Sequence, residues 1–245
     1  MPGFHHPLRN GHSQEEVTEI FRRHWDIYRK VVVNDCMSHK AAYGKLRDII
    51  TGAFGRPFSF ADLACGDAYW SSRCLAGTQV DEYTGIDLSE WALELAEKEL
   101  DKIRAPRRLI TGDFDEFDEY IDSPPDVVWV GLSVHHLPTD EKERFMKKVR
   151  EALPKDGLFL IYEPIFVEGE DGTTYTGRFE DVVRRNWTGL TPDELETVFD
   201  HVRKSDLPEL PSKWLSLGRD AGFTTAEAVY TDPTDLYTVF KYSVA

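Results

Sequence analysis

The sequence is poor in cysteine and lacks the spacings in which cysteines build metal or disulfide sites. Cys36, Cys65 and Cys74 are the only three among 245 residues, and no two of them form a CxxC pair. Neither a zinc site nor a disulfide framework is indicated. We therefore expect reduced thiols and no bound metal.

Long apolar runs are also missing. No segment reaches the roughly 18 consecutive apolar residues that a membrane span requires. The N-terminal stretch MPGFHHPLRNGHSQEE has neither the basic start nor the apolar core of a signal peptide. These absences predict a cytoplasmic protein without a membrane partner.

The sequence has fewer basic than acidic residues. Lysine and arginine together number 29 against 44 aspartate and glutamate residues, which gives a net charge of -15 and a pI near 4.9. Nucleic acids are bound chiefly through lysine and arginine, so this balance argues against a nucleic-acid partner. We expect a small-molecule partner, and a monomer or homodimer.

What the sequence does contain is a regular alternation of strand and helix patterns. From residue 58 onward, short apolar runs alternate with helix-period or turn segments, which predicts parallel strands with crossover helices. The runs are FSFADLA, EYTGID, RRLITGD, DVVWVGLS and GLFLIYEP, followed near the C-terminus by TTAEAVY and LYTVFKYSV. The fold class is therefore α/β, with a doubly wound sheet.

Helical segments stand before, within and after this pattern. Ser13 and Glu16 have capping-box spacing at the start of an amphipathic helix, and Ser38 is expected to cap a second helix. Thr139 is expected to cap TDEKERFMKKVREAL, whose charged residues form a solvated face. TPDELETVFDHVRK and PSKWLSLGRDAGF are also expected to be helices.

These patterns suggest two parts. Residues 1–55 form an N-terminal helical cap or lid, and residues 56–245 form the main domain. An insertion at about 164–215 is expected to contribute to a substrate pocket. We see no internal repeat.

The stretch FADLACGDAYW ends a predicted central strand and passes through one glycine into a helix. Such a turn lies at the carboxyl edge of the sheet, where ligands bind, and Gly66 lets a ligand approach the backbone closely. Asp87 follows Gly66 by 21 residues (87 − 66), a spacing suited to an acid that binds ribose hydroxyls. Asp62 and Asp67 favour a cationic adenosine ligand over a pyrophosphate.

Together these motifs resemble those of class I S-adenosylmethionine-dependent methyltransferases of the small-molecule type. DLACGDA matches the first motif of the family, with alanine in place of two of its three glycines. The similarity covers about residues 56–163 well and the C-terminal hairpin more loosely. It implies a seven-stranded Rossmann-like sheet, mostly parallel with a C-terminal antiparallel strand, and S-adenosylmethionine as cofactor with S-adenosylhomocysteine as product.

The resemblance also implies which residues bind the cofactor. They lie in the first turn and after the next three strands: Asp62, Ala64, Cys65, Gly66, Asp67, Asp87, Leu88, Asp113, Phe114, Gly131 and Leu132. For some of them a structural role competes: Asp62 and Asp87 as turn formers, Phe114 as a core residue. Cys65 has no visible activating partner and is interpreted as a small packing residue, not a nucleophile.

Catalysis is expected at the end of the fourth strand. In family members with a similar HHL stretch the histidine before the leucine can act as base, so His136 is the candidate general base and His135 the second candidate. One of the two can instead be structural. The remaining histidines, His201 among them, are expected at the surface or in packing.

The acceptor is expected to contact Tyr28, Tyr43, Arg178 and Trp187, although the tyrosines also suit a core and the arginine a solvated surface. Two other functions stay open. A nicotinamide-dependent oxidoreductase is disfavoured by the missing phosphate loop, and a non-catalytic protein that binds S-adenosylmethionine would keep the same motifs.

Overall fold

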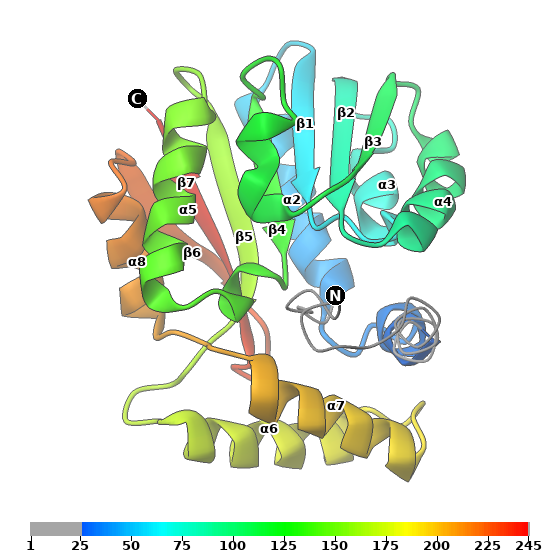
Figure 1. The fold of residues 1–245 in the computed structure, drawn as a ribbon, viewed down its shortest axis with the longest axis vertical. Helices are drawn as coiled ribbons and strands as arrows, with labels where there is room; N and C mark the ends of the chain where they lie inside the picture. The colour runs from blue at the N-terminus through cyan, green and yellow to red at the C-terminus, as the bar shows by residue number, and fades with distance from the viewer. Residues whose placement is uncertain (1–25, 245) are drawn as a thin grey trace.

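The computed structural model describes residues 26–244 (Figure 1). A seven-stranded sheet runs through the molecule in the order β3-β2-β1-β4-β5-β7-β6. β7 pairs antiparallel with both of its neighbours, and the first five strands pair in parallel. The strands are β1 Phe58–Leu63, β2 Val80–Asp87, β3 Arg107–Thr111, β4 Val127–Gly131, β5 Leu158–Pro164, β6 Thr225–Thr231 and β7 Tyr237–Ser243.

All seven strands lie where the sequence predicts them, and the Rossmann-like topology with its C-terminal antiparallel strand is confirmed. The central strands are mostly apolar because both faces of the sheet are covered. Phe60 on β1 and Trp129 on β4 face one core cluster, whereas Ala61 and Val128, one residue away, face the other. This period of two follows from strand geometry.

Helices cover both faces. The first core cluster holds residues of α2, α3 and α4, and the second holds residues of α5 and α8. The helices are α2 His39–Ala53, α3 Tyr69–Leu75, α4 Glu90–Glu99, α5 Thr139–Ala152, α6 Gly172–Asn186, α7 Pro192–Ser205 and α8 Pro211–Asp220, with single 3-10 turns at η2 Leu100–Lys102, η3 Phe114–Glu119 and η4 Val134–His136. None of the described helices is long and apolar enough to cross a membrane.

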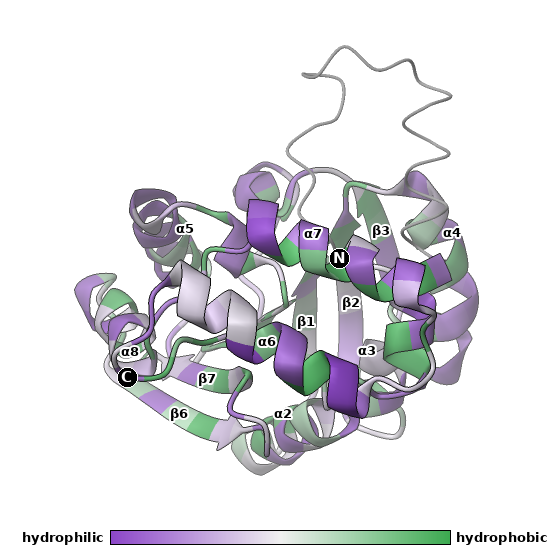
Figure 2. Cartoon of the chain, turned by 90° about the horizontal axis from the view of Figure 1, so that it is seen from below, coloured by the Kyte–Doolittle hydropathy of each residue, from purple (hydrophilic) through white to green (hydrophobic). Residues whose placement is uncertain are grey.

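The inserted segment is a pair of helices laid across the carboxyl edge of the sheet. Figure 1 shows α6 and α7 beyond the lower ends of the strands, and Figure 2 looks onto the same pair from below. α7 is the helix predicted over TPDELETVFDHVRK, whereas α6 was not predicted as a helix. Both begin with a capping box, at Asp171 and at Thr191. Because this pair covers the edge where ligands bind in such sheets, it is placed to close a site.

The N-terminal part agrees with the sequence as far as it is described. Residues 26–33 are helical, as expected, and the capping box at Ser13 and Glu16 lies outside the described residues. α2 is fully integrated into the core, because its apolar face at Ala42, Leu46 and Ile50 has no exposed surface.

Two expected caps are wrong. Ser38 precedes α2 but has a left-handed backbone, with φ 53°, and its side chain caps nothing; the Asp35 carboxylate accepts from the Lys40 N–H at 2.9 Å instead. Thr139 is the first residue of α5, not its cap, and its hydroxyl donates to Glu209 at 2.8 Å.

The charged face expected on α5 is not wholly solvated. Lys142 has no exposed surface, and its ammonium donates to the Leu207 carbonyl and, at 3.1 Å, to Glu209. This buried cation ties α5 to the loop that follows α7.

Candidate functional site

The turn after β1 has a tightly wound backbone. Ala64, Gly66 and Ala68 all have left-handed φ angles, between 52° and 57°. The turn is closed by hydrogen bonds from Cys65 N to Ile86 O and from Ala68 N to Cys65 O, each 3.0 Å. The two alanines that replace family glycines therefore keep the conformation that glycine adopts freely, at a cost of about 1 kcal/mol each.

Asp87 lies beside this turn at the end of β2. Its Oδ2 accepts from the Gly66 N–H at 2.8 Å and its Oδ1 from the Ser89 N–H at 2.9 Å. The side chain is almost completely buried, and this burial raises its pKa to about 6. The two backbone hydrogen bonds orient Asp87. Each carboxylate oxygen keeps a second lone pair, which can accept a hydrogen bond from a ribose hydroxyl.

Asp62 and Asp67 add two more acids. Asp62 accepts from the Tyr83 hydroxyl at 2.7 Å, and burial raises its pKa to about 7. Asp67 accepts from the Tyr69 N–H at 3.0 Å, and burial raises its pKa as well. A cluster of buried acids held by neutral donors fits a ligand that carries positive charge, as the sulfonium and ammonium groups of S-adenosylmethionine do.

The other residues predicted to bind the cofactor follow the ends of neighbouring strands. Leu88 is exposed. Asp113 caps η3, because its Oδ1 accepts from the Asp115 N–H at 3.1 Å. The Phe114 ring packs edge-on against Phe145, with 5.3 Å between ring centroids. Burial raises the pKa of the Cys65 thiol well above its usual range, so it stays protonated at neutral pH, as expected of a packing residue.

The end of β4 holds Gly131 and Leu132. A Cβ at Gly131 would lie 3.3 Å from the Tyr43 hydroxyl, closer than most Cβ contacts, so a larger residue there would require Tyr43 to shift by a few tenths of an ångström. Leu132 has a left-handed φ of 56°, and its N–H donates to the Tyr162 carbonyl at 2.7 Å. A strained backbone of this kind is often found at functional sites.

A pocket of about 120 Å³ opens at this edge of the sheet. Its wall is largely apolar and comes from the N-terminal helix, the end of β4 and the α6–α7 pair. Lining residues include Tyr28, Leu132, Phe179, Trp187, Val202 and Tyr237. His135, His136, His201 and Asp206 form its polar part.

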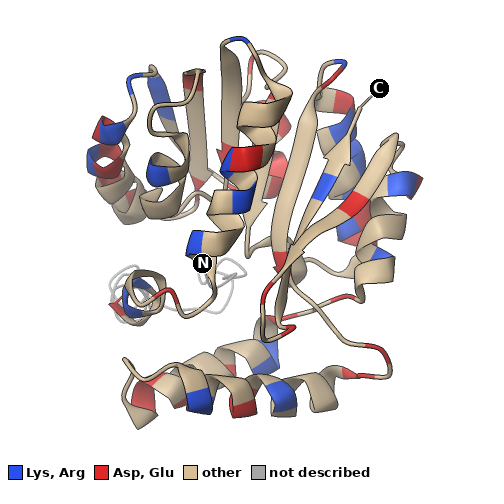
Figure 3. Ribbon diagram, turned by 180° about the vertical axis from the view of Figure 1, so that it is seen from behind, with Lys and Arg blue, Asp and Glu red and all other residues tan. Residues whose placement is uncertain are grey.

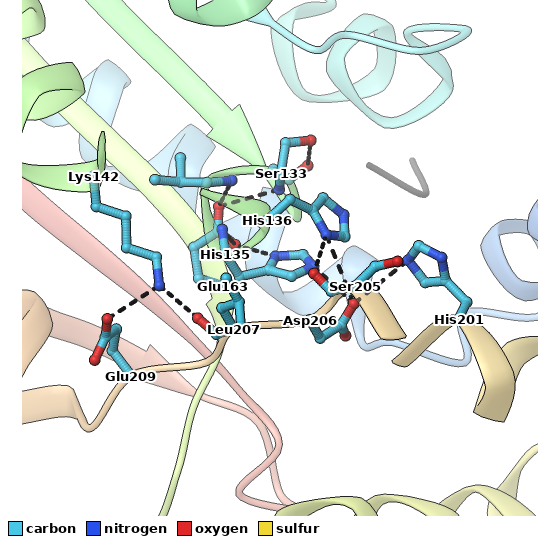
Figure 4. Close-up of polar contacts among 12 residues, drawn as sticks. Ser133, His135, His136, Lys142, Glu163, His201, Ser205, Asp206, Leu207 and Glu209 are labelled. Carbon is cyan, nitrogen blue, oxygen red and sulfur yellow. Dashed lines mark hydrogen bonds and ion pairs between the residues drawn. The ribbon is translucent and has the colours of Figure 1, made fainter. Parts of the chain in front are cut away.

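His135 is held between two carboxylates (Figure 4). Its Nδ1 lies 2.6 Å from Glu163 Oε2, and its Nε2 lies 3.5 Å from Asp206 Oδ1. Burial opposes the charged ring, but attraction to Asp206 and Glu163 outweighs it and raises the pKa of His135 to about 9. His135 is therefore cationic at neutral pH.

Glu163 supports the whole turn that carries both histidines. Its carboxylate also accepts from the backbone N–H groups of Ser133, Val134 and His135, at 2.9 to 3.3 Å. Because Glu163 is the second-last residue of β5, the strand itself fixes the position of η4 beside the pocket.

His136 is neutral. Burial and the neighbouring charge of His135 hold its pKa well below the usual range. Its Nδ1 lies 3.1 Å from the Ser205 carbonyl, which can only accept, so the ring proton is on Nδ1 and Nε2 is in its basic form.

Sequence reasoning missed three residues of this cluster. His201 was expected at the surface or in packing, but it lines the pocket, and its Nε2 lies 3.4 Å from Asp206 Oδ1. Asp206 and Glu163 were not singled out at all. The spacing of His201 and Asp206 at the end of a predicted helix was the only available signal, and nothing local linked it to His135, which lies about 70 residues earlier.

Two of the four residues expected at the acceptor, Tyr28 and Trp187, line the pocket. Tyr43 is not among the lining residues; its hydroxyl accepts from the Trp129 indole N–H at 3.1 Å.

The prediction that Arg178 contacts the acceptor is not supported by its contacts. Its guanidinium forms a two-point ion pair with Glu170, at 2.6 and 2.8 Å, and donates to the Asp235 and Ile165 carbonyls. These contacts occupy the hydrogen-bond donors of the guanidinium. They join α6 to the neighbouring loops.

Comparison with known proteins agrees with this geometry. Residues 60–157 match the family model described as a methyltransferase domain. These 98 residues (157 − 60 + 1) are similar to a methyltransferase domain, and this similarity supports S-adenosylmethionine as the cofactor. The matched range runs from within β1 to the residue before β5 and includes the turn at Gly66, Asp87 and both histidines of η4.

The relatives are distant. A carboxy-S-adenosyl-L-methionine synthase 1 of Yersinia pseudotuberculosis is 23% identical over 211 residues, which cover 82% of this chain and 86% of the relative. Human N-acetylserotonin methyltransferase, solved in complex with S-adenosylmethionine, is 14% identical with a TM-score of 0.55 over 98% of this chain. A cyclopropane synthase of Mycobacterium tuberculosis is 19% identical with a TM-score of 0.51 over 75% of this chain. The chain spans 62% of the length of each of these two structures, whose likeness shows the fold.

Proposed function

We propose that the protein transfers the methyl group of S-adenosylmethionine to an oxygen or nitrogen atom of a small molecule bound in the pocket, with His136 as the general base. The observation that carries this proposal is the position of the pocket. It lies at the carboxyl edge of the sheet, its wall includes Leu132 from the predicted cofactor-binding residues, and its polar part includes the two histidines that follow β4.

The acid cluster supports binding of the donor. The Gly66 and Ser89 N–H groups hold Asp87 with lone pairs left for ribose hydroxyls, and Asp62 and Asp67 would provide negative charge for the cationic part. When bound, S-adenosylmethionine supplies a methyl carbon activated by its positive sulfur. A nicotinamide dinucleotide, whose pyrophosphate is anionic, suits these acids poorly.

The chain's own contribution is to hold the acceptor, exclude water and take up a proton. The carbon–sulfur bond breaks as the new carbon–oxygen or carbon–nitrogen bond forms, and the acceptor proton passes to His136 Nε2. The Ser205 carbonyl keeps the other ring nitrogen protonated, so the basic nitrogen is Nε2. The apolar wall from α6 and α7 keeps water away.

The pocket wall also suggests the kind of acceptor. Phe179, Trp187 and Tyr237 are all nearly fully buried aromatic residues around the pocket. We infer an acceptor with a flat apolar body and one hydroxyl or amine group, a combination that such a wall and a single base recognise.

Replacing His136 by alanine tests the proposal. The change should leave affinity for S-adenosylhomocysteine within about threefold and lower turnover by roughly 10²- to 10⁴-fold, the usual contribution of a general base. Turnover is measured as transfer of labelled methyl from S-adenosylmethionine to the small-molecule fraction of a cell extract. The same reaction is also analysed by mass spectrometry for modified forms of the cofactor. This is done because the Yersinia relative is named as a synthase of carboxy-S-adenosyl-L-methionine.

Two results would contradict the proposal. Near-normal turnover per folded His136→Ala molecule, together with a sharply lower Tm, would assign His136 to the scaffold. Tight binding of S-adenosylmethionine without any transfer by the unmodified protein would favour the non-catalytic alternative.

A further inference from the structure

One oxygen atom in the pocket is surrounded by imidazole nitrogens at unusual distances. Asp206 Oδ1 lies 3.5 Å from His135 Nε2, 3.8 Å from His136 Nδ1 and 3.4 Å from His201 Nε2 (Figure 4). The Asp206 side chain is only 9% exposed. Within the described part of the chain, this buried oxygen accepts no hydrogen bond.

These distances are too long for the bonds that the charges predict. A charge-assisted bond between an imidazolium and a carboxylate is about 2.7–2.9 Å long, and His135 makes one such bond, to Glu163. In a tetrahedral site with metal–ligand bonds of about 2.0–2.1 Å, neighbouring ligand atoms lie roughly 3.3 Å apart. The separations around Asp206 Oδ1 are close to that value.

The surroundings of His135 also match those of a metal ligand. A histidine that binds a metal through Nε2 usually donates its Nδ1 proton to a carboxylate or carbonyl, which fixes the ring and strengthens the ligand. Glu163 takes this role here and is itself fixed by three backbone N–H groups.

We propose that Asp206 Oδ1, His135 Nε2 and His136 Nδ1 bind a divalent transition metal such as Zn²⁺. One ligand atom from each of the three residues already lies within 4.8 Å of the other two, so a small inward shift completes the site. All three residues line the pocket, so the fourth coordination position opens to it. Sites with three protein ligands and an open position are typical of catalytic metals, which bind and polarise a substrate atom.

The inference shares the pocket of the proposed function but does not depend on it. Metal binding releases the Nε2 proton of His135 to solvent. It also moves the His136 ring proton from Nδ1 to Nε2, which breaks the bond between Nδ1 and the Ser205 carbonyl. A loaded site would therefore activate an acceptor hydroxyl through the metal, and His136 would act as base only in the metal-free protein. A chelator distinguishes the two roles. It changes turnover if the metal activates the acceptor, and leaves turnover unchanged if His136 is the base in a metal-free protein.

Metal binding is measured directly, without substrate or cofactor. The chelator-treated full chain is titrated with Co²⁺ and followed by visible absorption and calorimetry, and then with Zn²⁺ in competition. We expect one equivalent per chain with absorption typical of a tetrahedral nitrogen and oxygen site. Asp206→Asn, which keeps the shape of the side chain, should weaken Co²⁺ binding at least tenfold, as should His136→Gln. Asp200→Asn, an exposed change on the same helix, is the matched control and should bind like the unmodified chain.

Circular dichroism and Tm establish that each variant is folded before its affinity is compared. The inference is overturned if the unmodified chain binds Co²⁺ no better than Asp206→Asn, or if both pocket variants bind as tightly as Asp200→Asn. A chain that binds Co²⁺ in this way but transfers no methyl group would refute the proposed function alone, and methyl transfer without such binding would refute the metal site alone.

Discussion

At the scale of single residues, the turn after β1 shows how a family motif tolerates alanine. Ala64 and Ala68 take left-handed conformations that glycine adopts without strain. They differ in their surroundings, because Ala68 is buried in the core whereas Ala64 is only partly buried. Replacing Ala64 by glycine should therefore relieve strain and lose little packing.

We expect Ala64→Gly to raise the free energy of unfolding by about 0.5–1 kcal/mol, the strain relieved less the greater entropy that glycine adds to the unfolded chain. Urea denaturation measures the change. Ala76→Gly is the matched control: Ala76 has an ordinary φ of -55°, so the same substitution should destabilise by about 0.5–1 kcal/mol. Equal destabilisation by both changes would contradict the strain at Ala64.

Asp87 supports a second prediction at this scale. Asp87→Ala should weaken binding of S-adenosylmethionine and S-adenosylhomocysteine by roughly 1–3 kcal/mol, since it removes a buried charged acceptor and the anchor of the Gly66 N–H. Calorimetry with each ligand gives the affinity. Asp81→Ala, an exposed change on the same strand, should have no effect; unchanged affinity in Asp87→Ala would remove Asp87 from the cofactor site.

At the scale of elements, the strands were predictable, whereas only part of the pocket was. All seven strands follow from apolar runs and turn residues, because burial on both faces leaves a strong local signal. The caps at Ser38 and Thr139 were wrong because capping depends on backbone angles that the sequence does not show. The contact of Asp206 with His135 joins α7 to the end of β4 across about 70 residues, so no local pattern could reveal it.

The helix pair over the pocket is held together by charge as well as by apolar contacts. The Arg203 guanidinium, on α7, bonds to Glu180 on α6 and, at 2.7 Å, to Glu196 on its own helix. Figure 3 shows acidic and basic residues interspersed along both helices. Phe179 and Phe199 meet edge-on beneath these pairs, with 6.2 Å between ring centroids. The pair thus forms one wall of the pocket as a unit.

Access to the pocket should depend on the N-terminal helix. We expected residues 1–55 to form a helical cap or lid, but α2 packs its apolar face into the core and is a fixed part of the fold. Binding of S-adenosylhomocysteine should therefore slow hydrogen exchange in residues 26–37, which contribute Tyr28 to the pocket, and leave α2 unchanged. Equal protection of both segments, or of neither, would contradict a lid limited to the first helix.

At the scale of the whole molecule, the buried acids of the cofactor site couple stability to pH. Burial raises the pKa of Asp62 to about 7 and that of Asp87 to about 6. In the unfolded chain both ionise near pH 4. Between about pH 4 and 7 the folded state keeps protons that the unfolded state has lost, so the contribution of these groups to stability is present below pH 4 and is lost as pH rises through 6 to 7.

A cationic ligand reverses this trend, because it favours the ionised carboxylates. S-adenosylmethionine should therefore raise Tm by more at pH 7 than at pH 5, and its binding at pH 6 should release protons. Calorimetry in buffers with different heats of ionisation counts those protons, and Asp62→Asn should release fewer. Comparing bound and free protein at each pH cancels the titration of groups far from the ligand. Proton uptake on binding, or a Tm increment independent of pH, would show that the acids around the Gly66 turn do not face the positive charge of the cofactor.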